Sequence, residues 1–494
     1  MTRQVRFRRG STAQHAAFTG ALGEVTVDTS KKTAVVHDGV TPGGWPLALE
    51  NSSVANGLAA TRAILKAMDP DSIPAAYLME SGREGRFVWR AGDFSTNVAA
   101  DTLEGIYIKA DSVAASVGAW VRAEKDPVNV KWFGAVGDGV TDDQAAFNAI
   151  PSVLPANGGE IYIPAGRYVL GAAWSIASKS VSIRGAGVKV AMLFFAGSTN
   201  GITYTANDLA RMITVENLSI VTLTNASTIG LSISFPSNAG SSWKNCTIRD
   251  VVLDSTSTIA AYENTNNSQN AARWFKGIVA NNVAGLTIDN VHVRGRAATK
   301  DSRGIEVTGW TVDMKITNCI LQFHDVALFK KDALEGFNIS GVVGLSCKEF
   351  VRIWNAETHV PANPSGTWGY ITNCHSGCSV RVLDIRNYAQ TFITNNLFYQ
   401  DGASTTFSHI FASVCDGLKI IGNHLAGVNV ANGWNIQLAG CYAAIVSNNF
   451  LFGRFFGVEL DSSCTKPVVT GNQSQGSIAN GATGTSVVTD NLTL

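Results

Sequence analysis

The sequence predicts an all-β chain whose largest part is a parallel β-helix. Three observations carry this prediction. Short, β-prone runs recur through the second two thirds of the chain. Each ends in a polar turn that contains asparagine. The composition also fits, because 48 glycines and only 15% charged residues are typical of a β-rich protein with many turns. A chain of 494 residues is long for one compact domain, but a solenoid grows by adding coils.

The repeat itself sets the size of one coil. Aligned on its final residue, the asparagine phrase returns at positions 374, 396, 423, 449, 472 and 491, with spacings of 22, 27, 26, 23 and 19 residues. Three strands of about five residues, joined by unequal turns, account for such lengths. A strand-rich repeat of this period without a leucine-rich consensus indicates a parallel β-helix. Asparagine suits the turns because it tolerates left-handed backbone and its amide can bond to the next coil.

The eight cysteines follow the same repeat, so we expect them to be buried, free thiols. They form two predicted columns, Cys246, Cys319 and Cys374, and Cys415, Cys441 and Cys464. The alternative is that Cys374-His375-Ser-Gly-Cys378 forms half of a zinc site. A structural zinc site needs four ligands, and no second CxxC or HxH pair is present. We therefore predict no metal site, no cofactor and no required disulfide.

Residues 127–158 are predicted to cap the first coil. The run 128–133 has a strand pattern, and residues 134–139 bring three glycines for a turn. Thr141 is the expected helix N-cap, with Gln144 at the capping-box position. Pro151 and Pro155 are expected to stop the helix.

The stretch WFGAVGDGVTDDQAAFNAI within this cap resembles the opening signature of pectate-lyase-like right-handed β-helix proteins, a group that includes bacteriophage tailspikes. The resemblance implies a right-handed parallel β-helix over residues 159–494. It does not specify a reaction. The acids Asp138, Asp142 and Asp143 are expected to cap the loop and helix rather than to catalyse.

Residues 1–50 form a separate predicted module. Two alternating strands, 24–28 and 33–37, flank a four-residue connection and predict a hairpin. This stretch resembles an N-terminal module of phage tail fibres and receptor-binding proteins, which implies attachment to tail or baseplate proteins, or trimerisation. Residues 51–126 are predicted to be a linker, with a helix over 58–68, and a small β domain.

Several function classes are excluded by composition and motif. Lys+Arg and Asp+Glu are both 38, so the net charge is zero and no nucleic-acid partner is expected. No run of 18 apolar residues or secretory signal occurs, so we expect no membrane insertion. The GxSxG, HExxH and GxxxxGK[ST] motifs are absent.

The resemblance to tailspikes implies a homotrimeric virion protein that is made in the host cytoplasm and acts at the host cell surface. It would bind a bacterial surface polysaccharide (capsule, O-antigen or exopolysaccharide) and depolymerise it. Glycoside hydrolysis needs only two carboxyl groups and leaves no sequence motif. The alternatives are a non-catalytic adhesin on the same fold and a polysaccharide lyase. A secreted cellular enzyme is disfavoured by the missing signal and the tail-fibre-like N-terminus.

The candidate site is placed where a long insertion, residues 355–367, interrupts the rhythm of the coils. Tryptophans bracket it, and aromatic faces can stack on sugars. The outward column is predicted to contain Glu306, Arg352, Arg381 and Glu459. The candidate acids and bases are Glu306, Asp332 and Glu357, with Asp384 and Glu335 in reserve. The candidate substrate-binding residues are Trp354, Trp368, Tyr370, Arg352 and His359, and a lyase would instead depend on Arg352, Lys330 and His359.

Overall fold

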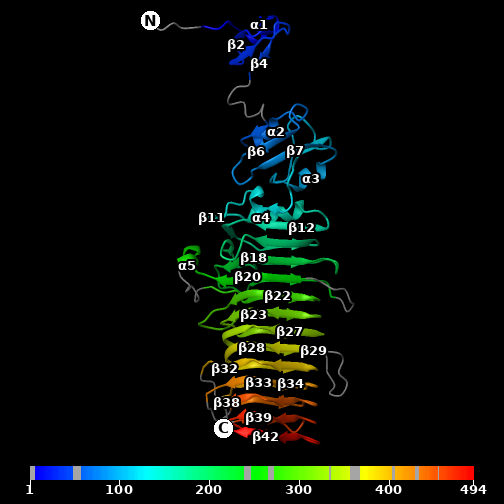
Figure 1. Ribbon diagram of the computed structural model, residues 1–494, viewed down its shortest axis with the longest axis vertical. Helices are drawn as coiled ribbons and strands as arrows, with labels where there is room; N and C mark the ends of the chain where they lie inside the picture. The colour runs from blue at the N-terminus through cyan, green and yellow to red at the C-terminus, as the bar shows by residue number, and fades with distance from the viewer. Residues whose placement is uncertain are drawn as a thin grey trace. The chain divides into compact units, whose positions relative to one another are not determined.

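The computed structural model describes residues 6–47, 57–237, 246–264, 272–332, 335–355, 368–402, 406–428, 433–453 and 456–494. The chain divides into two compact units, 1–125 and 126–494 (Figure 1). No helix among the described residues has the length and hydropathy of a membrane span.

The N-terminal module is a four-stranded sheet in the order β1-β2-β3-β4. Its strands are β1 (Arg9–Gly10), β2 (Val25–Asp28), β3 (Thr33–Val36) and β4 (Trp45–Pro46). β2 and β3 pair antiparallel, as the hairpin pattern predicts, whereas β1 pairs parallel with β2. Helix α1 (Thr12–Ala16) follows β1, and a capping box between Ser11 and Gln14 satisfies its first amides.

Residues 57–122 contain a second, five-stranded sheet in the order β5-β6-β7-β9-β8. Its elements are β5 (Leu58–Ala59), α2 (Arg62–Ala67), β6 (Ala75–Leu78), β7 (Gly85–Ala91), α3 (Ser95–Ala100), β8 (Tyr107–Ile108) and β9 (Gly118–Arg122). The predicted helix over 58–68 is too long, because Leu58 and Ala59 pair with β6 as a strand. The side chain of Thr61 then caps the helix by accepting the Ile64 N–H.

The remaining 35 strands form one parallel sheet wound into coils, which confirms the predicted parallel β-helix. Successive coils stack in three columns of strands, which we call faces 1, 2 and 3. Several long strands turn a corner without a break, so that their two halves belong to different faces.

Face 1 contains β10 (Val128–Asn129), β12 (Gly158–Ile163), β15 (Ser180–Gly185), the first halves of β18 (Ile213–Thr222), β20 (Cys246–Ser255) and β22 (Leu286–Arg294), β24 (Met314–Thr317), β27 (Gly336–Ser340), β29 (Trp368–Thr372), β31 (Thr391–Thr394), β34 (Lys419–Ile421), β37 (Ile445–Ser447), β40 (Val468–Thr470) and β43 (Val487–Thr489).

Face 2 contains β11 (Asp138–Asp142), β13 (Gly166–Leu170), β16 (Ala191–Phe195), the second halves of β18, β20 and β22, β25 (Ile320–Gln322), the first halves of β28 (Val343–Trp354) and β30 (His375–Arg386), β32 (Leu397–Gln400), β35 (His424–Ala426), β38 (Phe450–Phe452), β41 (Gln473–Ser474) and β44 (Leu492–Thr493).

Face 3 contains β14 (Trp174–Ala177), β17 (Ile202–Thr205), β19 (Ile229–Ser234), β21 (Lys276–Asn281), β23 (Arg303–Thr308), β26 (Val326–Lys331), the second halves of β28 and β30, β33 (Ser408–Ser413), β36 (Trp434–Ala439), β39 (Phe456–Leu460) and β42 (Ser477–Asn480). Helix α5 (Ile259–Asn264) lies between β20 and β21 in the chain.

The turn asparagines form a buried ladder along the helix axis. The Asn423 side chain accepts the backbone N–H and the Nδ2–H of Asn396, at 3.0 and 2.9 Å. It donates to Ile393 O at 2.8 Å and to Asn449 Oδ1 at 3.0 Å. The same pattern continues through Asn472 to Asn491. Each amide therefore satisfies backbone groups that a turn would otherwise bury unpaired.

All eight cysteines are free and buried inside the coils. Burial raises the pKa of the Cys246 and Cys347 thiols to about 12, so they remain protonated at neutral pH. The side chains of described residues form no cluster suited to a metal ion.

The opening signature departs from the prediction in three details. The strand stops after Asn129, and Val130–Phe133 form a single 3-10 turn (η2) because Asn129 caps it. Thr141 belongs to β11 and is not the N-cap; helix α4 (Gln144–Val153) begins after Asp143. Pro151 lies within the helix instead of ending it.

The three acids of the signature bond to backbone amides. Asp138 accepts N–H groups from Val140 and Thr141, at 2.8 and 2.7 Å. Asp143 accepts the Val136 N–H at 2.6 Å. Asp142 accepts the Gln144 N–H at 2.9 Å. These bonds hold the glycine turn against the helix. The three acids therefore have a structural role, and no catalytic role is needed to explain them.

Candidate functional site

One column of outward side chains on face 3 runs through the predicted site. Strand register aligns Glu306 with Phe329, Phe329 with Arg352, and Arg352 with Asp384. Farther along, the same column reaches Glu459. Three of the four residues predicted for this column therefore share it. The fourth, Arg381, aligns with Glu349, and Asp384 occupies the expected place. Arg381 and Asp384 both lie in the second half of the twelve-residue β30, and only the register with β28 distinguishes their columns.

A cavity of about 390 Å³ opens on this face. The residues that line it are Arg303, Glu306, Thr308, Phe329, Lys331, Asp332, Arg352 and Trp354. Four predicted site residues thus come together: Glu306, Asp332, Arg352 and Trp354.

Glu306 is only 4% exposed, and two cations enclose its carboxylate. Lys276 Nζ lies 2.6 Å from Oε1, and Arg303 ion-pairs with Oε2. Both partners belong to face 3, since Lys276 aligns with Arg303 on the neighbouring coil. A buried carboxylate needs such partners. As an ion-paired anion, Glu306 suits the role of base or nucleophile better than that of proton donor.

Asp332 follows β26 in a left-handed conformation, with φ of 74°. Its Oδ2 accepts the Gly309 N–H at 3.1 Å, and no described cation pairs with it. Behind it, Lys330 points inward and is fully buried. Its Nζ donates to Gly309 O at 2.7 Å and to Lys331 O at 2.5 Å. Desolvation lowers the pKa of Lys330 to about 7. Lys330 thus braces the turn that presents Asp332 and is not itself exposed to substrate.

Arginines and aromatic rings alternate along the face. Arg303 lies 4.5 Å from the centre of the Phe329 ring, and Arg352 lies 4.8 Å from that of Trp354. From the next coil, Arg386 approaches Trp354 at 4.6 Å. Guanidinium groups stacked on rings have limited rotamer freedom. The face is therefore a rigid, amphipathic surface.

Carboxylates pair with these arginines. Arg352 binds Glu349 at 2.6 Å, and Asp384 binds both Arg381 and Arg386, at 2.7 and 2.8 Å. Burial opposes ionisation of Asp384, but the hydrogen bond from Arg386 and the nearby charges outweigh it, so its pKa is lowered. Asp384 is thus held as an anion and is unsuited to be a proton donor.

Two of the predicted substrate residues lie elsewhere. Trp368 and Tyr370 belong to β29 on face 1, where Tyr370 stacks on Phe392 at 5.1 Å. Trp354 ends β28 on face 3 and Trp368 begins β29 on face 1. Trp368 does not line the cavity, and the bracketing of one subsite by the two rings stays a prediction. Glu335 is exposed in the turn after β26 and does not line the cavity. Glu357 and His359 lie outside the described residues.

Sequence reasoning missed Lys276 and Arg303 on this face. The signal was available in the repeated segments RGIEVT and VALFKK, which become adjacent strands in register. Their alignment places Arg303 and Phe329 around Glu306.

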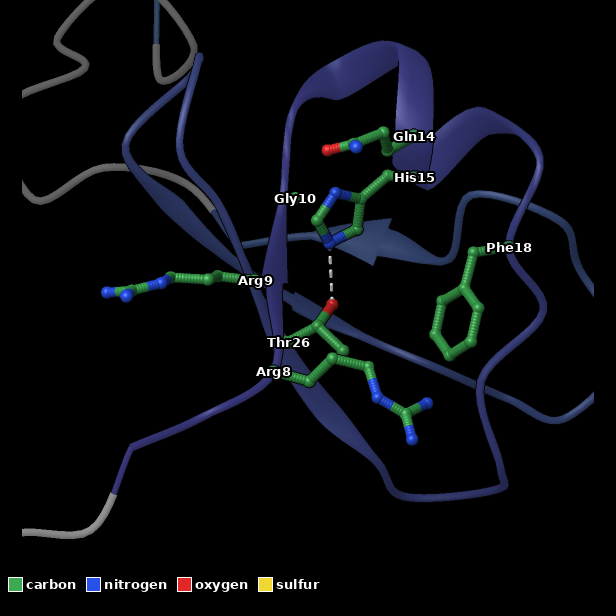
Figure 2. Close-up of a pocket in the computed structure, with 7 residues that line it drawn as sticks. All are labelled: Arg8, Arg9, Gly10, Gln14, His15, Phe18 and Thr26. Atoms are coloured by element: carbon green, nitrogen blue, oxygen red, sulfur yellow. Dashed lines mark hydrogen bonds between the residues drawn. The ribbon is translucent and has the colours of Figure 1, made fainter.

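A second cavity, of about 250 Å³, lies in the N-terminal module (Figure 2). Arg8, Arg9 and Phe18 line it, and the His15 ring points toward Thr26. Thr26 Oγ1 lies 2.8 Å from His15 Nε2 and 2.9 Å from His37 Nε2. Since Gly20 N–H donates to His37 Nδ1, His37 Nε2 donates to Thr26, whose hydroxyl donates on to His15. The chain of donors is complete when both histidines are neutral.

Family models match both parts of the chain. Residues 127–352 match the model described as Rhamnogalacturonase A/epimerase, pectate lyase-like. Residues 5–41 match the Major tropism determinant N-terminal domain.

Curated relatives match shorter stretches. The tail fiber receptor-binding protein of Bordetella phage BPP-1 is 67% identical over 48 residues, which cover 10% of this chain and 13% of that protein. Mannuronan C5-epimerase AlgE4 of Azotobacter vinelandii is 28% identical over 170 residues, 34% of this chain and 26% of that protein. The match thus spans a small part of either relative.

Among solved structures, tailspike protein 3 of bacteriophage CBA120 superimposes with a TM-score of 0.50 at 13% identity, over 98% of this chain and 76% of that one. This similarity concerns the fold. Together, the comparisons confirm the predicted resemblance to phage tail proteins with a pectate-lyase-like β-helix.

Proposed function

We propose that this chain, which joins a tail-determinant module to a pectate-lyase-like β-helix, is a tailspike that binds and cleaves a bacterial surface polysaccharide on face 3. Residues 1–50 would attach it to the phage tail or baseplate, with three copies assembled side by side. The observation that carries the proposal is the cavity on face 3, where a carboxyl group bound by a backbone N–H and an ion-paired carboxylate lie among stacked arginines and rings.

The reaction best suited to these groups is hydrolysis. Asp332, which forms no ion pair within 4 Å among the described residues, donates a proton to the glycosidic oxygen as the C–O bond breaks. Glu306, held by Lys276 and Arg303, acts at the anomeric carbon as nucleophile or directs a water molecule to it. One water is consumed for each bond cleaved. Trp354 and Phe329 offer ring faces for the sugars, and Arg352 supplies hydrogen-bond donors.

A lyase is less compatible with the site. Of the bases expected for a lyase, Lys330 is fully buried beneath the cavity and His359 lies outside the described residues, so the described residues do not supply the expected base. A non-catalytic adhesin is the second candidate, favoured by the ion pairs that occupy Glu306, Glu349 and Asp384.

The test is to incubate the purified chain with capsule or O-antigen from candidate hosts and to identify the products by mass spectrometry. Hydrolysis predicts saturated oligosaccharides whose summed mass exceeds that of the intact chain by one water for each bond cleaved. Unsaturated ends would contradict the hydrolase proposal. Binding to the host glycan with no products at all would favour the adhesin.

Variants then test the assignment of residues. Glu306→Gln should abolish cleavage while glycan binding persists. The matched control is Glu459→Gln, since Glu459 occupies the same column outside the cavity, beside Gln437. Equal loss of activity in both variants would remove Glu306 from the reaction.

A further inference from the structure

The outward surface of face 2 is mainly apolar over the late coils. From β25 onward, strand register aligns one outward column that contains no Asp, Glu, Lys or Arg. Its members are Ile320, Val343, His375, Leu397, His424, Phe450, Gln473 and Leu492. The column is outward because the next residues along the strands, such as Phe398, Leu425 and Leu451, are fully buried.

A second outward column lies beside the first, two residues farther along each strand. Its members are Leu345, Gly377, Tyr399, Ala426 and Phe452. The exposed fraction is 39% for Ile320, 43% for Leu397, 41% for Phe452 and 57% for Leu492. We call the two columns together the apolar stripe. Large apolar side chains exposed in a continuous row indicate a binding surface.

Contacts between its own rings order the apolar stripe. The ring centres of His424 and Phe450 lie 4.8 Å apart, and those of His375 and Tyr399 lie 5.4 Å apart. Phe450 also stacks on Phe452 across the two columns, with 6.2 Å between ring centres and an interplanar angle of 7°. These side chains therefore lose little rotamer freedom when a partner covers them, which favours association.

Both other faces carry charged residues in their outward columns. The column on face 3 contains Glu306, Arg352 and Asp384. On face 1, register places Lys315 and Lys419 in one outward column. The apolar stripe is therefore a property of face 2 and not of the β-helix in general.

The apolar stripe is large enough to bind a protein. Eight aligned positions separate its ends by seven spacings of about 4.8 Å, so the stripe is about 34 Å long. Two columns of side chains make it about 12 Å wide, which gives about 400 Å² of surface. Exposed apolar patches of this size are often functional on soluble proteins.

Two features of the apolar stripe indicate that its partner is a second copy of this chain. Equivalent residues approach one another near a symmetry axis, where like charges would repel, and the stripe contains no acidic residue, lysine or arginine. Its outward side chains recur once per coil, about every 4.8 Å. A copy whose β-helix runs in the same direction repeats at that spacing over the whole stripe, whereas a globular partner does not.

We propose that the apolar stripe is the surface through which copies of this chain pack against one another, with their β-helices parallel and in register. The inference rests on the proposed assembly of three copies and names the face that lies toward their common axis. Leu397 and Phe452 of each copy are then covered by the neighbouring copies. Face 3 lies outside this contact, so its cavity remains open to polysaccharide.

The experiment is disulfide cross-linking of the full chain through one introduced cysteine. All eight native cysteines are buried, so a mild oxidant acts on the introduced thiol. Gln473→Cys, in the apolar stripe, brings equivalent thiols together near the axis and should give covalent dimers on a non-reducing gel. The matched control is Val487→Cys, at an exposed outward position of face 1 on the next coil, which should give none.

A charge introduced into the apolar stripe supplies a second measurement. Leu397→Glu places equivalent carboxylates close together, and their repulsion should lower the cross-linking yield of Gln473→Cys about tenfold. Val487→Glu, which adds the same charge on face 1, should leave the yield unchanged. The yield reports on the β-helix itself, so it is informative even where residues 1–50 also join the copies. Phe452→Glu repeats the test if circular dichroism shows that Leu397→Glu does not fold.

Equal cross-linking of Gln473→Cys and Val487→Cys, or no covalent dimer from Gln473→Cys, would overturn the proposal. An unchanged yield in Leu397→Glu together with weaker binding of host polysaccharide would overturn it too, since face 2 would then be a glycan surface. Cleavage of polysaccharide by a chain that sediments as a monomer would refute this assembly and leave the proposed reaction intact. Covalent dimers from Gln473→Cys without any cleavage would support the apolar stripe and remove the proposed hydrolysis.

Discussion

The asparagine ladder should contribute strongly to the stability of the β-helix, and Asn423→Ala tests this directly. Asn423 is 1% exposed and sits in the middle of the ladder. Its removal leaves the Asn396 N–H and the Ile393 carbonyl without their side-chain partner. Water cannot replace the amide unless the turn opens.

The magnitude follows from these two backbone groups. Leaving a buried donor or acceptor unpaired costs about 1–3 kcal/mol, so two of them cost about 2–6 kcal/mol. Asn491→Ala is the matched control, because Asn491 makes the equivalent bonds to Asn472 and Val469 from a partly exposed position. Solvent can reach the groups freed there, and we expect a loss of about 1 kcal/mol.

The assay is denaturant-induced unfolding followed by circular dichroism, with wild type, Asn423→Ala and Asn491→Ala measured in parallel. Asn423→Ala should unfold at a clearly lower denaturant concentration than Asn491→Ala. If the two variants unfold at the same denaturant concentration, the buried ladder does not stabilise the fold. The free-energy cost assigned to the two unpaired backbone groups would then be wrong.

Three more predictions follow from the site and the N-terminal module. Trp354→Ala should weaken binding of the host glycan about tenfold, whereas Tyr370→Ala, on face 1, should have little effect in the same calorimetric titration. Lys330 has a pKa of about 7 when folded against 10.5 unfolded, so the unfolded chain binds more protons between these values. Stability should therefore rise from pH 7 to pH 10, by roughly 3–5 kcal/mol at most, and Lys330→Met should flatten the dependence measured by denaturant unfolding. Thr26→Val removes the hydroxyl between His15 and His37 and should lower the protection of the β2 and β3 amides against hydrogen exchange, with exposed Thr19→Val as control.

The architecture was predictable because the same sequence repeat occurs in successive coils. The asparagine phrases fixed the coil length, and the ladder through Asn396, Asn423 and Asn449 explains why the phrase recurs. The position of the α4 N-cap was harder to predict. Thr141 and Asp143 both suit an N-cap, and the choice depended on Asp143 reaching the Val136 amide, a contact across the turn.

The site was only partly predictable for a related reason. The sequence predicts that Glu306 and Arg352 share one column, because each is a charged residue between two apolar residues of a β-prone run. It cannot show that Trp354 ends a strand of face 3 while Trp368 begins a strand of face 1. Nor does the sequence reveal that Lys330 points inward. Strand residues alternate between inward and outward, and only the pairing with a neighbouring strand shows which of them point inward.

The long strands β28 and β30 pass from face 2 to face 3 without a loop, and each is hydrogen-bonded to its neighbours on both faces. An insertion at that corner would break the register of two columns at once. Between face 3 and face 1, thirteen residues separate Trp354 from Trp368, whereas four separate β26 from β27, and β29 still pairs with β27. Loops can therefore be exchanged at one corner of these coils and not at the other, so engineered insertions should be introduced after Trp354.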